Sequence, residues 1–193
     1  LGIVWNTATP RRVVQLDLYG AGWAAGAGSG SIHFTLPFDK AYPGWIGNVV
    51  DAHLIGYIDL SGLTELYAVD LRAQDSILGL TVNGLNKLEY IMFSRNDFTA
   101  SLDFSNLPNL QHIHMSLMDA LTGLNASNCP RLKLLKSKYN TLTSFNISGS
   151  DSLQAIVINY GGSGLNAIDL TGKTELQYLW MRDNDIQSLP GIN

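Results

Sequence analysis

Cysteine is almost absent from this 193-residue sequence, and charged side chains are scarce. The single cysteine, Cys129, excludes a disulfide bond within the chain. Charged residues make up 15% of the chain, below the ~25% that is usual for soluble domains. The 16 acidic residues outnumber the 12 basic ones, which gives a net charge of −4. This balance provides no basic footprint for nucleic acid and no polybasic segment for an anionic membrane.

Long apolar runs are also missing. No run approaches the ~20 residues of a membrane-spanning helix, so we expect no membrane insertion. No cationic leader followed by an apolar core is present, and the sequence therefore carries no signal for localisation. The chain begins at Leu1 and not at methionine, from which we expect a processed protein or a fragment.

The residue sets that catalysis requires cannot be assembled from this sequence. No nucleophile, base and acid fall into one pattern. Asp59, Asp103 and Asp169 lie on the convex side, one to a coil, at the same position of three repeats, as solvated turn-forming residues do. The glycine-rich stretch 20–30 follows the alternating residues 13–18, but no βαβ pattern continues from it. It predicts a flexible or elaborated loop and not a nucleotide site. We therefore predict no enzyme activity and no cofactor.

An internal repeat organises most of the chain. One set of leucines recurs at spacings of 22, 22, 22, 21 and 23 residues: Leu66, Leu88, Leu110, Leu132, Leu153 and Leu176. An apolar-x-apolar pair lies eight residues before each of them: Ile58/Leu60, Leu80/Val82, Leu102/Phe104, Leu124/Ala126, Phe145/Ile147 and Ile168/Leu170. Two markers that keep one period through six copies predict a solenoid.

Residues 85–98, 132–142 and 176–186 show the repeat most clearly and fit the pattern L-x-x-L-x-L-x-x-N-x-L. The alternating part predicts a short strand, with Ile91 and Phe93 pointing inward. The asparagine of each copy falls where the chain must turn and can bond unpaired backbone groups. Cys129 takes a leucine position of its repeat, so we expect a small buried residue and not a reactive thiol.

The closing segments of the repeats alternate again, which favours extended structure and not helix on the convex side. In this detail the chain resembles the leucine-rich repeats with the pattern LTSLDLSxNxxLxxL that are common in surface and secreted proteins of Bacteroidetes-type bacteria. The resemblance covers about two thirds of the chain. It implies a horseshoe-like, right-handed coil with parallel strands on the concave face and extended or 3₁₀ segments on the convex side. Such repeats are scaffolds that bind many kinds of ligand.

We predict a single continuous domain with about eight coils, roughly 40 Å long at ~4.8 Å per strand step. Residues 1–62 would form an N-terminal cap and two degenerate coils, and residues 63–193 six regular repeats. No polar cap is visible at the C-terminal end. A solenoid needs one, so we expect that the parent chain continues or that another subunit covers this end.

The outward side chains of the predicted strands form a candidate binding surface. Aromatic and apolar residues occupy outward positions that an idle surface would fill with small or charged residues, and lysine and arginine border them. The predicted ligand- or partner-binding residues are Tyr90, Met92, His112, His114, Leu134, Lys136, Tyr178, Trp180 and Arg182. Tight packing of such a face on itself is the alternative. We expect no metal at His112 and His114, since their strand neighbours offer no third ligand.

Two functions of different classes follow. The first is recognition of a protein or glycan by a module of a larger surface, secreted or phage-particle protein, at the cell surface, outside the cell or on a virion. It predicts that Tyr90, Met92, Tyr178 and Trp180 are exposed to solvent. The second is a structural spacer whose ends pack on other chains, which predicts that these side chains or residues 189–193 are buried against a partner.

Overall fold

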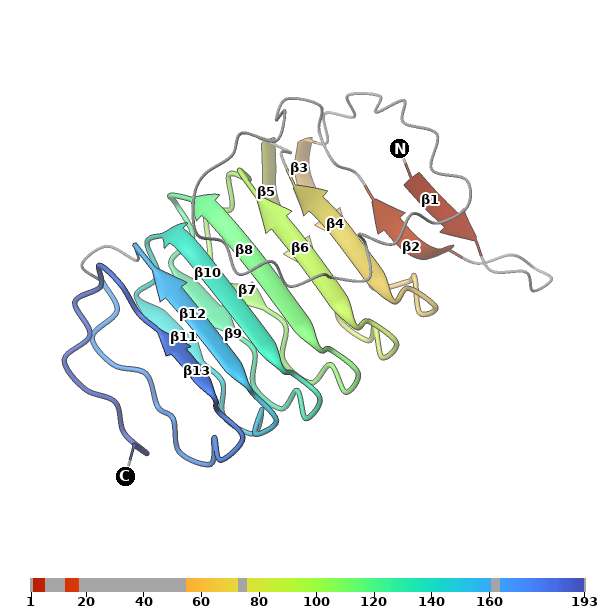
Figure 1. Cartoon of the computed structure of the whole chain (residues 1–193). Coiled ribbons are helices and arrows are strands. Elements are labelled where there is room, and N and C mark those ends of the chain that lie inside the picture. The colour runs from red at the N-terminus through yellow and green to blue at the C-terminus, as the bar shows by residue number, and fades with distance from the viewer. Residues whose placement is uncertain (1, 6–12, 18–54, 73–75, 161–163, 193) are drawn as a thin grey trace, which may run out of the picture.

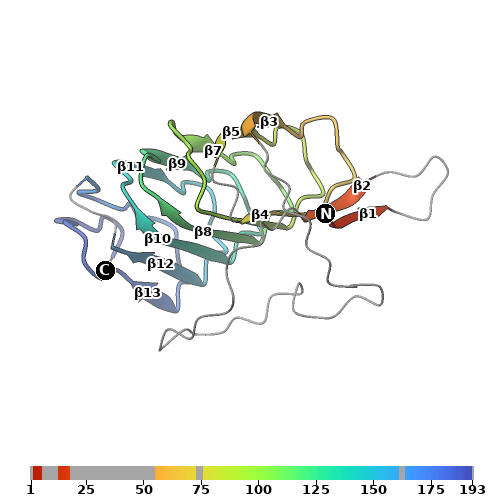
Figure 2. The ribbon, with the colours of Figure 1, turned by 90° about the horizontal axis from the view of Figure 1, so that it is seen from above.

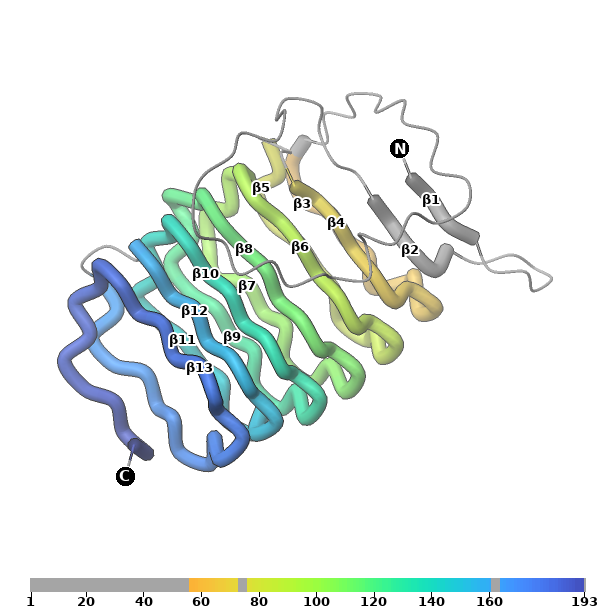
Figure 3. The backbone as a smooth tube through the Cα atoms, in the orientation of Figure 1, coloured from red at the N-terminus to blue at the C-terminus, as the bar shows by residue number. Residues whose placement is uncertain are grey.

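The computed structural model of the chain describes residues 2–5, 13–17, 55–72, 76–160 and 164–192. These residues form an all-β structure in which parallel strands stack as a solenoid of about five turns (Figures 1 and 3). No helix occurs within the described ranges. Among them there is accordingly no helix long and apolar enough to cross a membrane.

The main layer is an eight-stranded sheet with the strand order β1-β2-β4-β6-β8-β10-β12-β13. β1 is antiparallel to β2, and every later neighbour is parallel. The strands are β1 (Gly2–Trp5), β2 (Val13–Asp17), β4 (Ala68–Arg72), β6 (Tyr90–Ser94), β8 (His112–Met118), β10 (Leu134–Asn140), β12 (Ala155–Asn159) and β13 (Tyr178–Trp180). The alternating residues 13–18 noted in the sequence include the strand β2.

Two smaller sheets form the opposite, convex side (Figure 2). They are the three-stranded sheet of β7 (Leu102–Asp103), β9 (Gly123–Asn125) and β11 (Ser144–Asn146), and the pair β3 (Ile55–Asp59) and β5 (Ser76–Thr81). The predicted extended structure on the convex side is confirmed. The predicted turns form as well, because Asp59, Asp103 and Asp169 each accept a hydrogen bond from the backbone N–H two residues later.

The hydrophobic core fills the space between the main sheet and the convex side. Ile91 and Phe93 are fully buried in it, as their alternation predicts. Cys129 is also fully buried, and its Sγ lies 3.1 Å from the carbonyl oxygen of Phe104. Burial raises the pKa of this thiol, which keeps it protonated and unreactive at neutral pH.

The repeat asparagines close the turns between coils as predicted. The Asn140 carboxamide oxygen accepts the backbone N–H of Met118, and its Nδ2 donates to Ser137. Asn96 and Asn184 donate to the carbonyl oxygens of Leu71 and Ile158. Each bond reaches back to an earlier coil or to a buried hydroxyl, so the three asparagines pair backbone and side-chain groups inside the turns.

Equivalent residues of successive repeats stand side by side in the main sheet. One row of register partners is Ala68, Tyr90, His112, Leu134, Ala155 and Tyr178. The next is Asp70, Met92, His114, Lys136, Val157 and Trp180. Both rows are absent from the hydrophobic core cluster. They lie on the side of the main sheet turned away from the core, which we call the outer face.

A buried lysine interrupts one of the leucine positions. Lys173 takes the position that Leu63, Leu85, Leu107, Cys129 and Ser150 occupy in the earlier repeats. Its Nζ bonds Asp151 at 2.8 Å and the Thr171 carbonyl at 3.1 Å. Its side chain is 2% exposed, whereas that of Asp151 is 60% exposed.

Replacing this lysine by leucine should stabilise the fold. We expect Lys173→Leu to raise the free energy of unfolding by about 1 kcal/mol, because burying an apolar side chain removes the desolvation cost of the ammonium group. Lys173→Ala, which leaves a gap, should lower it. Urea unfolding of both variants measures this, and a loss of stability in the leucine variant would show that the ion pair outweighs apolar packing.

The described residues include only part of the predicted coils and of the predicted N-terminal region. About five turns are described, and the predicted count of about eight includes residues 1–62. Most of that region, with the glycine-rich stretch 20–30, lies outside the described residues. The division of the chain at residues 62 and 63 and the full count therefore stay predictions.

Candidate functional site

The outer face places the predicted binding residues in adjacent rows but does not expose them equally. Tyr178 is 59% and Trp180 42% exposed, whereas Met92 is 4% and Leu134 6% exposed. The expectation that Met92 is exposed to solvent is therefore wrong. It stands between neighbours on its own strand and on strands ~4.8 Å away, and side chains so close together cover one another.

The exposed pair belongs to the last strand of the sheet. β13 pairs with β12 on one side, and no described strand pairs with its other side. Tyr178 and Trp180 are two residues apart and therefore point to the same face. The exposed part of the candidate site is thus at this end of the sheet.

The two histidines lie on β8, in neighbouring rows of the outer face. The His112 ring meets the Tyr90 ring edge-on, with 5.1 Å between centroids. Its Nδ1 is buried without a hydrogen-bond partner. Burial lowers the pKa of His112, and Lys133 lowers it further. Burial also lowers the pKa of His114, to about 3, with contributions from Lys136, Arg72 and Lys138. Both imidazoles are therefore neutral at pH 7.

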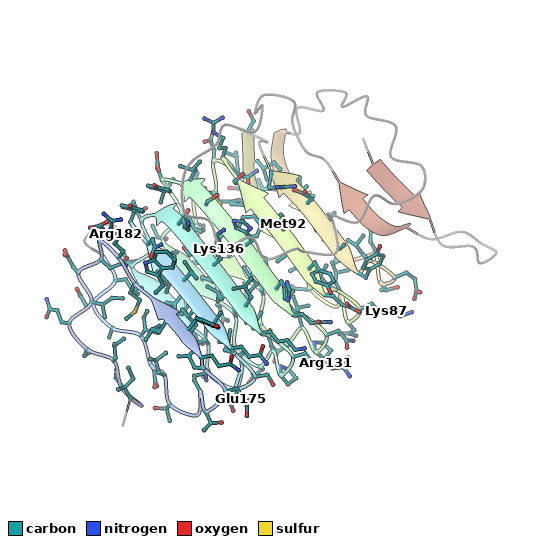
Figure 4. All side chains as sticks on the ribbon, in the orientation of Figure 1. Lys87, Met92, Arg131, Lys136, Glu175 and Arg182 are labelled. Carbon is teal, nitrogen blue, oxygen red and sulfur yellow. The ribbon has the colours of Figure 1, made fainter. Side chains whose placement is uncertain are left out.

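Two lysines follow on β10, where His114 pairs with Lys136 in the register and Ser116 with Lys138. Both lysines are partly buried, and neither forms an ion pair or hydrogen bond with another residue that the structure describes. Burial lowers the pKa of Lys136, and the neighbouring charge of Lys138 lowers it further. Figure 4 shows Met92, Lys136 and Arg182 on the same face of the sheet, away from Lys87, Arg131 and Glu175 along the edge.

A row of left-handed residues ends the strands of the main sheet. Its members have backbone φ angles between 54° and 57° and are one repeat apart: Arg95, Leu117, Tyr139, Tyr160 and Asp183. Leu117 is 39% and Tyr139 47% exposed. Left-handed backbone costs a residue with a Cβ atom about 1–2 kcal/mol. We call these five residues the left-handed row.

A second set of left-handed turns shows which residues suit this conformation. On the convex side the equivalent positions are all glycine or asparagine: Gly84, Asn106, Asn128, Gly149 and Gly172. These two residue types tolerate positive φ best. The left-handed row instead carries leucine and two tyrosines, so the chain accepts strain where large side chains face solvent.

The two tyrosines of the left-handed row stack on each other. Their rings are parallel within 2°, with 4.5 Å between centroids. The Arg182 guanidinium carbon lies 5.7 Å from the Tyr160 ring centroid. Arg182 is two residues after Trp180, and its carbonyl oxygen accepts the Tyr160 N–H at 2.8 Å. The stack therefore joins the exposed end of the outer face. We call Tyr139, Tyr160, Tyr178, Trp180 and Arg182 the aromatic surface.

Sequence reasoning identified three members of the aromatic surface and missed Tyr139 and Tyr160. Their position in the sequence could have identified them. Each tyrosine directly follows the last outward residue of its strand and comes just before an asparagine or glycine, where a turn is expected. A bulky residue at a turn position that demands positive φ is unusual in itself. Among the described residues, no group of three His, Cys, Asp or Glu side chains is placed to hold a metal ion.

Comparison with known proteins gives no relative. No family model matches the chain, and neither a curated protein nor a solved structure matches it.

Proposed function

We propose that the chain is a non-catalytic recognition module of the leucine-rich-repeat type that binds a protein or glycan through the outer face of its main sheet. It would belong to a larger surface, secreted or phage-particle protein, in keeping with the repeat pattern. The proposed contact residues are those of the sequence analysis without the buried Met92 and Leu134, and Tyr139 and Tyr160 join them.

The observation that carries this proposal is the exposure of the aromatic surface. Two of its rings, Tyr178 and Trp180, are more than 40% exposed on the strand β13, and the other two stack on each other with Arg182 beside them. Tyrosine, tryptophan and arginine are the residues that most often dominate binding energy at interfaces. A large exposed apolar patch bordered by polar groups is typical of a binding site.

The strain at Tyr139 supports the same conclusion. Stacking of two aromatic rings contributes about 0.5–1.5 kcal/mol, which only offsets the cost of left-handed backbone at one of them. Asparagine would adopt this backbone at lower cost, as Asn106 and Asn128 do on the convex side. The Tyr139 ring therefore adds little net stability to the fold. Contact with a ligand would account for a tyrosine at this position.

A single substitution can separate binding from folding. We expect Tyr139→Asn to change the free energy of unfolding by less than about 1 kcal/mol, because relief of strain offsets the lost stacking. Ligand binding by this variant, and by the double variant Tyr178→Ala, Trp180→Ala, should weaken at least tenfold. Screening of glycan and surface-protein arrays with the wild-type chain identifies the ligand, and titration of the variants measures the loss.

Tyr57 provides the matched control. It is 77% exposed and lies on β3 of the convex side, so Tyr57→Ala should bind like the wild type. Variants that bind fully despite loss of the aromatic surface would contradict the proposal.

A structural role is the second candidate, and the C-terminal end favours it. Leu179 and Met181 are only partly buried, whereas the equivalent Leu135 and Met115 are fully buried. Ile192 is 56% exposed. An apolar end with an unpaired strand edge can pack on another chain. Self-association of the wild-type protein that Tyr178→Ala, Trp180→Ala relieves, measured by light scattering, would favour assembly over recognition.

A further inference from the structure

From β4 to β13 the outer face carries more cationic than anionic side chains, although the chain as a whole is acidic. Between β4 and β13 its outward positions carry four cationic side chains, Arg72, Lys136, Lys138 and Arg182. They carry one carboxylate, Asp70. The whole chain has a net charge of −4. A surface whose charge opposes that of the rest of the molecule attracts ligands of the opposite sign.

Two of these four cations are already compensated. Arg72 makes a two-pronged ion pair with Asp70, in which Nε lies 2.9 Å and Nη2 2.6 Å from the carboxylate oxygens. Arg182 lies 3.1 Å from the Asp183 carboxylate. Lys136 and Lys138 have no such partner among the described residues, so within them the uncompensated charge of the face is concentrated on β10.

The two lysines lie together in surroundings that raise the cost of their charge. They are two residues apart on one strand, about 6.6 Å along it, and point to the same side. The neighbours of Lys136 across the sheet are His114, a neutral imidazole, and Val157, which is buried; those of Lys138 are Ser116 and Asn159. Like charges at this spacing repel, and partial burial strengthens the repulsion. An anion between the two ammonium groups would remove it.

The ligand of this site should not depend on hydrogen bonds to the protein backbone. All backbone N–H and C=O groups inside the main sheet point sideways into the ladder, so the face itself offers none to a ligand. An extended peptide lying across Val157 and Leu134 would lose water from its own backbone groups without replacement. A sugar chain keeps its outward hydroxyls in water, and its ring faces can pack on the exposed Trp180, two strand steps or about 9.6 Å from Lys136.

We propose that Lys136 and Lys138, with His114 beside them, bind the anionic group of an acidic glycan whose neighbouring sugar rings pack on Trp180 and Tyr178. This inference rests on the proposed recognition function and specifies its ligand class. Carboxylate and sulfate groups share the required chemistry, since each offers several oxygens to two ammonium groups.

Four probes test the proposal by titration calorimetry at low salt. They are an oligogalacturonate, the same oligomer with its carboxyl groups reduced, a dextran sulfate oligomer and a poly-glutamate peptide. We expect submillimolar binding of one or both acidic sugars, tenfold or more weaker binding of the reduced oligomer, and a loss of affinity when salt rises from ~0.05 to ~0.5 M. Uronate and sulfate ligands are distinguished by which acidic oligomer binds more tightly.

Substitutions locate the site. Lys136→Gln and Lys138→Gln should each weaken binding about tenfold, as expected for a lost hydrogen bond to a charged group. Both variants should fold as well as the wild type, because each removes like-charge repulsion. Lys133→Gln removes the same charge just before β10, at the far end from Lys138, and should bind normally.

Several outcomes would overturn the inference. These are equal binding of the reduced oligomer, unchanged affinity in both lysine variants, preference for poly-glutamate, or no binding of either acidic oligomer at millimolar concentration. If Tyr139→Asn and the Trp180 variant still lose an array ligand in those cases, the proposed recognition function holds and only the acidic-glycan assignment fails.

Discussion

Replacing Phe93 by alanine is expected to lower the free energy of unfolding by about 3–5 kcal/mol, the range for truncation of a buried phenylalanine. Phe93 is fully buried, and its ring contacts Phe98 edge-on and Phe104 at a tilt, each with 5.6 Å between centroids. Alanine would leave a cavity that a tightly stacked solenoid cannot close, because the ~4.8 Å strand spacing fixes the neighbouring coils.

Two further variants test whether the loss of stability comes from the cavity in the core or from the loss of a phenylalanine as such. The next coil has Met115 at the equivalent position, so Phe93→Met should cost less than about 1.5 kcal/mol. Phe145 is only partly buried, and Phe145→Ala should cost less than Phe93→Ala. Urea unfolding followed by circular dichroism measures all three. A smaller loss in Phe93→Ala than in Phe93→Met would show that this phenylalanine cluster does not hold the coils together.

The period of the sequence was sufficient to predict the sheet and its register. A constant repeat of about 22 residues places each Tyr90-like position beside the next one, and the alternation within a strand decides which side chains enter the core. Both follow from backbone geometry alone. For this reason the outward rows, the buried Cys129 and the extended convex side could be predicted residue by residue.

Side-chain neighbours could not be predicted in the same way. The burial of Met92 and Leu134 depends on how the side chains around them fill the outer face, and no local pattern encodes this. Ser137 and Lys173 are polar residues at positions that point into the coils, where the repeat pattern predicts apolar residues. They are accommodated because Asn140 bonds the serine and Asp151 bonds the lysine, partners that only the folded coil brings close.

The tyrosine stack illustrates a third kind of information. A repeat pattern specifies that a turn follows each strand, but it does not specify the sign of φ within the turn. The structure shows the left-handed backbone at Tyr139 and Tyr160, and the comparison with the glycine and asparagine turns gives it meaning. Strain, unlike register, becomes visible only when backbone angles are known.

The second large effect concerns pH. The folded protein should lose stability as the pH falls from 7 to 4, and His114 should account for about 3 kcal/mol of the loss. The pKa of His114 is lowered from 6.5 to about 3, first by burial and then by Lys136, Arg72 and Lys138. Because the unfolded chain binds a proton near pH 6.5 and the folded chain does not, each pH unit between the two values favours unfolding by ~1.36 kcal/mol.

The direction of this dependence is fixed by the lowered pKa. Stability is fully present above pH 6.5, falls between pH 6.5 and 3, and stops falling on account of His114 once both states are protonated. Burial also lowers the pKa of His112, which adds a loss in the same direction. Comparison of the wild type with a variant that lacks the His114 imidazole isolates the larger contribution.

His114→Met is that variant, since Met92 occupies the adjacent place in the same row of the outer face. We expect it to fold, to match the wild type near pH 7 within about 1.5 kcal/mol, and to exceed it in stability at pH 4. Urea unfolding at pH 4, 5, 6 and 7 measures the difference. If the two proteins lose stability equally as the pH falls, His114 takes up its proton in the folded state as readily as in the unfolded chain. Its surroundings on the outer face would then be open to water.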